Sequence, residues 1–147
     1  IMMGTITYAI TTIFNSDIDS VAEEINNAIR DVRVEAMSSV NENYEFRLGY
    51  DGTKLQYFYS IVEVPSNTER SKVYLNKRIT LMKLDSSVFY PINDTRFSAV
   101  NLTISFNKAI GSISTMGYGT YQLVHNNSGQ TVKLIITKET GGGEVVK

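Results

Sequence analysis

The chain has 147 residues, a formal net charge of −1, 42% hydrophobic residues and 20% charged residues, which suits one folded domain. The near-neutral charge argues against an electrostatic nucleic-acid binder, and no stretch clusters five Lys or Arg residues as a basic membrane-surface patch would. With no cysteine in this sequence, disulfides, thiolate metal sites and cysteine nucleophiles are excluded. The sequence contains no window of about 20 apolar residues, which is the length that a helix needs to cross a bilayer.

An amphipathic helix is predicted from Asp17 to Met37, because apolar residues recur there at the i, i+3, i+4, i+7 spacing. Asn15 or Ser16 could cap its start, and Asp17 and Asp19 would then lie near the positive end of the helix dipole. The apolar stripe is expected to pack on the rest of the domain through Ile18, Val21, Ala22, Ile25, Ile29 and Val32.

The apolar residues of the preceding segment, Thr5–Phe14, fit both the strand period and the helix period. Ile6, Tyr8 and Ile10 alternate as in a strand, but the segment also continues the helical stripe without a phase break. No Gly or Pro separates Phe14 from the strong stripe, so we favour one helix from Ile6 to Met37, about 48 Å long. That length exceeds what the domain's own core needs. The residues expected to pack in a filament or membrane are Ile6, Ile10, Ile13 and Phe14.

The remainder of the chain is predicted to be antiparallel β-structure, with turn clusters at 49–52 and 126–129. The predicted strands are Tyr44–Leu48, Lys54–Val64, Lys72–Leu84 as one or two strands, Ser87–Tyr90, Val100–Phe106, Gly119–Val124, Thr131–Thr137 and Glu144–Lys147. One helix followed by seven or eight strands is an α+β order. We expect a single domain over 1–147, in which a helix within 1–37 covers one sheet face of a β-rich head over 44–147.

Catalytic signals are weak. His125 is the only histidine; it is the one candidate base for a Ser-His-Asp triad, but it stands beside a turn, where an exposed hairpin-end residue is expected. Asp51-Gly52-Thr53 is similar to the end of a phosphotransferase loop, yet Gly49 occupies the position of the required first carboxylate, so a hairpin turn is expected instead. We therefore expect no enzyme activity and no cofactor.

Two further patterns leave alternatives open. Asp85 and Asp94 flank a loop whose oxygens could bind calcium, although their spacing matches no EF-hand, and an ordinary loop is the simpler interpretation. Tyr57 and Tyr59 share a strand face that could stack bases or sugars, but aromatic strand faces more often pack against a helix. The run at 141–143 follows a strand and precedes no helix, so it is not a phosphate-binding loop of the usual kind.

The end of the helix carries a family resemblance. The stretch Val32-Arg33-Val34-Glu35-Ala36-Met37 resembles the Ala-Arg-Ser-Glu-Ala-Ile motif of GspH/FimT-type pseudopilins, with Val34 in place of the usual serine. The late stretch Leu102–Asn107 followed by Gly111 is similar to the family's late strand and turn. Thr131–Thr137 followed by Glu139-Thr140-Gly141 is similar to its final strand and closing Thr-Gly, although Gly142 stands where arginine is frequent.

This resemblance implies a type IV pilin-like fold, in which an N-terminal helix anchors the subunit in the cytoplasmic membrane and later packs in a filament. It implies a minor pilin or pseudopilin of a type IV pilus, type II secretion or DNA-uptake system, on the cell surface, whose partners are other such subunits. It also implies an upstream leader and about 10–20 apolar residues, which with residues 1–14 would complete a membrane span. The alternative is a cell-surface binding or adhesin domain without a filament role, in which Thr5–Phe14 would be a strand.

Overall fold

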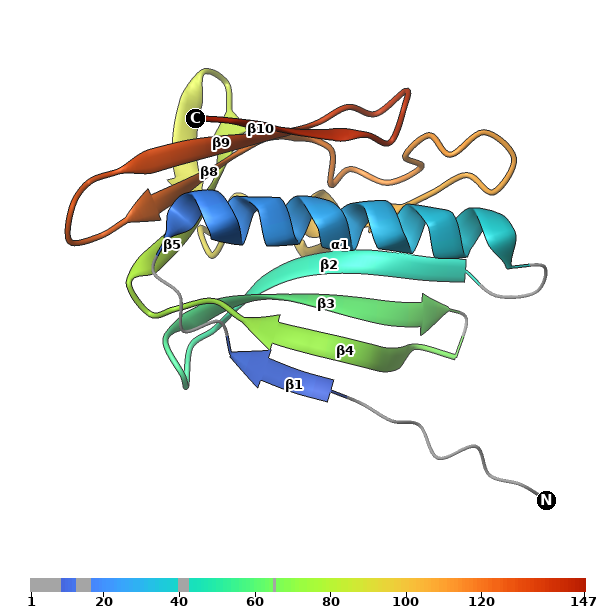
Figure 1. Ribbon diagram of the computed structural model, residues 1–147, viewed down its shortest axis with the longest axis horizontal. Coiled ribbons are helices and arrows are strands. Elements are labelled where there is room, and N and C mark those ends of the chain that lie inside the picture. Colours follow the sequence, from blue (N-terminus) through green and yellow to red (C-terminus); the bar gives the residue numbers. More distant parts are fainter. Residues whose placement is uncertain (1–8, 13–16, 40–42, 65) are drawn as a thin grey trace.

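One helix lies between two five-stranded β-sheets in the computed structural model, which describes residues 9–12, 17–39, 43–64 and 66–147 (Figure 1). The helix, α1, spans Ile18–Ser38. The strands are β1 Ala9–Thr12, β2 Asn43–Asp51, β3 Gln56–Val64, β4 Thr68–Tyr74, β5 Ile79–Asp85, β6 Val88–Pro91, β7 Thr103–Ser105, β8 Gly119–His125, β9 Thr131–Ile136 and β10 Gly143–Val146, with a 3-10 helix, η1, at Ala99–Leu102.

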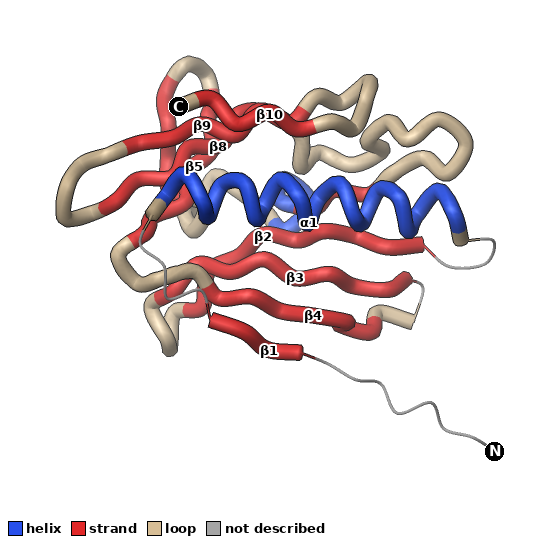
Figure 2. Tube along the Cα trace, viewed as in Figure 1, coloured by secondary structure: helices blue, strands red, loops and turns tan. Residues whose placement is uncertain are grey.

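Sheet A has the order β1-β4-β3-β2-β7, and sheet B has the order β10-β9-β8-β5-β6. All pairings are antiparallel except that of β1 with β4, which is parallel. Figure 2 shows α1 running between the two groups of strands. The helix contacts β2 of sheet A and β8, β9 and β10 of sheet B. The α+β class predicted from the sequence is therefore confirmed, but the helix packs between two sheets and does not simply cover one sheet face.

The apolar stripe of α1 enters a core that both sheets share. The six stripe residues predicted to pack inward are all at most 2% exposed. They join side chains such as Phe46 of sheet A and Leu123 of sheet B in one hydrophobic cluster. Phe46 also stacks on Tyr59, with ring centroids 5.2 Å apart. The buried stripe therefore links the two sheets.

The predicted helix from Ile6 to Met37 is wrong at residues 9–12, which form strand β1. Ile10 pairs with Lys72 of β4, in a parallel register that runs from Ala9↔Ser71 to Thr12↔Tyr74. β-Branched residues such as those at 10–12 favour strands, and β4 offers them an edge with free backbone groups. The other three residues expected to pack in a filament or membrane, Ile6, Ile13 and Phe14, lie outside the described residues.

The helix start also differs from the prediction, because Asp17 is the N-cap. Its Oδ1 accepts from the backbone N–H of Asp19 at 3.1 Å, and its Oδ2 accepts from Ser20 Oγ at 3.0 Å. Asn15 and Ser16, the caps suggested by the sequence, lie outside the described residues. Since a side-chain cap satisfies an otherwise free N–H, Asp17 defines where the described helix begins.

Candidate functional site

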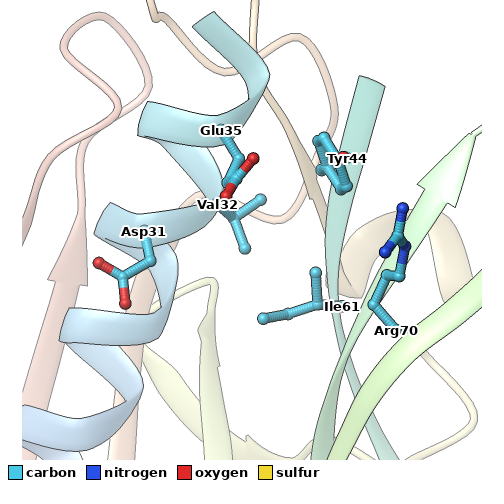
Figure 3. Close-up of a pocket in the computed structure, with 6 residues that line it drawn as sticks. All are labelled: Asp31, Val32, Glu35, Tyr44, Ile61 and Arg70. Carbon is cyan, nitrogen blue, oxygen red and sulfur yellow. The ribbon is translucent and has the colours of Figure 1, made fainter. Parts of the chain in front are cut away.

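One concave surface among the described residues is a groove of about 310 Å³ between α1 and sheet A (Figure 3). The helix supplies Asp31, Val32 and Glu35, and the sheet supplies Tyr44, Ile61 and Arg70. The groove exists because α1 contacts β2 at one side of the sheet, while β3 and β4 continue beyond it (Figure 1). The helix–sheet geometry therefore leaves this face partly open.

The chemistry of the groove suits contact more than catalysis. Asp31 and Glu35 form an exposed acidic wall, and Arg70 opposite pairs with Glu63, with Arg70 Nε donating to Glu63 Oε2 at 2.6 Å. None of the lining residues that the structure describes is a histidine, serine, threonine or cysteine. Deeper along the same side of the helix, burial and then the carboxylate of Glu24 raise the pKa of Tyr59 to about 12, so this phenol stays neutral. No nucleophile and base are brought together here.

His125 lies at the end of β8, as a hairpin-end residue. Its Nδ1 accepts from the backbone N–H of Asn127 at 3.3 Å and from that of Ser128 at 3.2 Å. These bonds tie the imidazole to its own turn, at Asn126–Gly129. None of its hydrogen bonds joins a serine hydroxyl or a carboxylate, as a triad would require.

Asp51 organises the β2–β3 turn. Its Oδ1 accepts from the backbone N–H groups of Thr53 and Lys54 at 2.9 and 3.1 Å, and its Oδ2 accepts from Tyr74 Oη at 3.0 Å. These hydrogen bonds, that from Lys54 foremost, lower the pKa of the carboxyl. Its oxygens are therefore engaged in turn contacts, as expected for an Asx-type turn.

The candidate calcium loop already contains a cation. Arg96 lies between the two aspartates, with its Nη1 3.4 Å from Asp85 Oδ2 and its Nε 3.2 Å from Asp94 Oδ1. Its guanidinium carbon lies 3.3 Å from the centre of the Tyr90 ring, which adds a cation–π contact. In the part of the chain that the structure describes, no group of three or more histidines and carboxylates is close enough to hold a metal ion.

Sequence reasoning missed one buried cation, Lys83. It is 7% exposed, and its Nζ donates to the carbonyls of Asn101 at 2.5 Å and Met116 at 3.0 Å. Burial lowers its pKa to about 8. The signal was in the alternation of β5, where Ile79, Leu81 and Lys83 occupy the same strand face and the first two are core residues. Because its two acceptors lie in η1 and in the segment before β8, Lys83 links these two parts of the chain to β5.

Three segments far apart in sequence meet at Arg33. The Nε of Arg33 donates to the carbonyl of Gly111 at 3.0 Å. Gly111 and Gly141 both have a left-handed φ, of 73° and 67°, which side chains disfavour. A Cβ on Gly141 would overlap the Gly111 carbonyl, so the two turns touch backbone to backbone. Arg33, Gly111 and Gly141 therefore form one packing cluster.

Comparison of the chain with protein families, with curated proteins and with solved structures found no match. Among the described helices, none is both long and apolar enough to cross a membrane.

Proposed function

We propose that the chain is the head of a structural filament subunit, a minor pilin or pseudopilin of a type IV pilus, type II secretion or DNA-uptake filament. Such a subunit is anchored in the cytoplasmic membrane before assembly and then lies at the cell surface. It acts by packing against other subunits and performs no catalysis.

The cluster at Arg33 is the observation that carries the proposal. Arg33 belongs to the helix stretch that resembles the pseudopilin motif, and Gly111 and Gly141 belong to the two later stretches that resemble the family's turns. The hydrogen bond from Arg33 to the Gly111 carbonyl, and the close approach of Gly141 to the same carbonyl, support a shared structural role for these three stretches. A resemblance spread by chance along a chain would not be expected to converge on one contact.

The exposed face of α1 supports the same proposal. One face of the helix holds the two sheets together, while Glu23, Asn27, Arg30 and Val34 lie exposed along the other. They are spaced by three or four residues, so they form one continuous stripe. A helix that carries the head on one side and leaves the other side free is suited to side-by-side packing with a neighbouring subunit.

A strain of the source organism that lacks the gene provides the test. We expect it to lose pilus assembly, type II secretion or DNA uptake, and we expect the native protein in the membrane fraction and in sheared filaments. Complementation with Ile25→Asp, which would place a charge in the core, should fail, whereas Lys77→Ala, at an exposed position outside α1, should restore the phenotype. Normal filaments and secretion in the deletion strain, with the protein absent from both fractions, would contradict the proposal.

A second candidate is favoured by β1. A surface binding domain without a filament role is the alternative that places residues 9–12 in a strand, and they do pair with β4. This alternative predicts a deletion strain that keeps its filaments and loses adhesion to a surface or ligand. The same strain therefore separates the two functions.

A further inference from the structure

A second cavity, of about 240 Å³, lies where α1 faces the connection between β9 and β10. The helix lines it with Asn26, Arg30 and Arg33, and the connection lines it with Gly141, Gly142 and Gly143. The three helix residues are spaced i, i+4, i+7, which places them on one face. Two arginines and an asparagine on one face of α1 therefore line one hollow.

Asn26 is the unusual member of this lining. It is only 7% exposed, and its side chain makes no hydrogen bond to any residue that the structure describes. In the described part of the chain, every fully enclosed polar side-chain atom has a hydrogen-bond partner. The amide atoms of Asn26 have none, so they are not fully enclosed and remain accessible from the cavity. The amide can therefore hydrogen-bond to a ligand that enters the cavity.

The charge in the cavity is uncompensated. The ion pairs among the described residues use Arg47, Arg70 and Arg96, whereas Arg30 and Arg33 pair with no described carboxylate. Arg33 is held in place because its Nε donates to Gly111, and that bond leaves its terminal nitrogens available. None of the described residues that line the cavity is acidic.

The glycines keep the hollow open. A Cβ on Gly143 would overlap Asn26 Oδ1, and one on Gly141 would overlap the Gly111 carbonyl. Gly142 differs, because the nearest atom to its Cβ would be Thr140 Oγ1 at 3.3 Å and its φ is not left-handed. Gly142 is therefore the position at which a side chain can be added to fill the cavity.

We propose that this cavity binds an oxyanion, a carboxylate, phosphate or sulfate group, through Arg30, Arg33 and Asn26. Guanidinium forks match the paired oxygens of such groups, and the amide N–H groups of Asn26 add neutral donors. The site goes beyond the filament role, and Arg30 belongs both to this cavity and to the exposed stripe of α1.

Titration of the ¹⁵N-labelled protein at constant ionic strength tests the site, with inorganic phosphate, sulfate and acetate in separate arms. We expect saturable shifts at the Asn26 side-chain amide and at the Gly142 and Gly143 backbone amides, with a Kd on the order of 1 mM. Tighter binding of phosphate or sulfate would indicate a phosphorylated or sulfated ligand, and tighter binding of acetate would indicate a carboxylate.

Matched variants separate this site from general surface charge. Arg30→Gln, at an exposed position, should weaken binding about tenfold or more, whereas Arg78→Gln, at another exposed arginine, should leave it unchanged. Gly142→Asp should abolish binding by placing a carboxylate in the cavity. Absence of saturation with all three anions, or equal loss in Arg30→Gln and Arg78→Gln, would overturn the proposal. Unchanged backbone spectra outside the cavity verify that each variant is folded.

Discussion

Ile25 lies in the centre of the stripe by which α1 joins the two sheets, so its truncation should weaken the whole domain. The side chain is 1% exposed and belongs to the shared core cluster. Replacing a buried isoleucine by alanine typically costs about 2–5 kcal/mol, because apolar contacts are lost and a cavity remains. A domain of this size has a total stability of about 5–15 kcal/mol. Ile25→Ala should therefore lower Tm by roughly 5–15 °C.

The matched control is Val34→Ala, on the same helix but 59% exposed. Its effect should stay within about 0.5 kcal/mol. Both free energies of unfolding can be measured by urea denaturation followed by far-UV circular dichroism, where an unchanged m-value shows that the comparison is valid. Ile25→Asp should be worse than Ile25→Ala, since it also buries an unpaired charge. Equal losses for Ile25→Ala and Val34→Ala would show that the packing face of α1 has been assigned incorrectly.

Three further predictions concern the head. Tyr121→Phe removes the donor of a buried 2.6 Å hydrogen bond to a backbone carbonyl, so it should lower the free energy of unfolding in urea by about 1–3 kcal/mol. The control Tyr90→Phe, whose ring is only half-buried, should lower it by less than about 0.5 kcal/mol. Burial lowers the pKa of Lys83 from 10.5 to about 8, so the unfolded chain binds more protons between those pH values and stability should rise with pH there. Above about pH 10 the stability should fall, because burial raises the pKa of Tyr59 to about 12 and the unfolded chain loses that proton first. Lys83→Met should abolish the rise in stability. A flat wild-type stability profile from pH 8 to 10 would contradict the predicted pH dependence. His125→Ala should leave secretion, pilus assembly or DNA uptake unchanged at equal protein level, and loss of any of these would contradict the non-catalytic assignment.

The strands of the head were largely predictable because their signals are local. The turn clusters at 49–52 and 126–129 predicted the β2–β3 and β8–β9 hairpins, and the structure confirms both hairpins. The first turn was placed too early, because residues 49–51 belong to β2 and the turn lies at 52–55. Lys72–Leu84 was expected as one or two strands, and it contains parts of β4 and β5. In these segments alternation and turn chemistry agree, so little depends on distant contacts.

The failures have physical causes that lie outside the local pattern. Residues 9–12 fit both a helical and a strand period, and the pairing with β4, about 60 positions later, decides between them. The predicted strand from Val100 is in part the 3-10 helix η1, with reciprocal hydrogen bonds between Ser98 and Asn101. Asn101 stands where the usual capping box has Glu or Gln, so the local pattern did not mark this helix start.

The candidate sites depended still more on tertiary structure. No local pattern could show that Arg96 lies between Asp85 and Asp94, or that Arg33 reaches Gly111. The groove between α1 and sheet A likewise arises from how the helix is placed between two sheets. Local sequence did indicate the polar outer face of α1, because it is the complement of the apolar stripe.

Site-specific photo-crosslinking in the source organism tests the filament assignment most directly. A photoreactive residue at Val34, on the exposed face of α1, is compared with one at Ser128, at the exposed tip of the β8–β9 hairpin. We predict adducts from position 34 that mass spectrometry identifies as neighbouring filament subunits, and none of these from position 128. Absence of subunit adducts from position 34, in cells that assemble the filament and express the protein, would contradict the assignment.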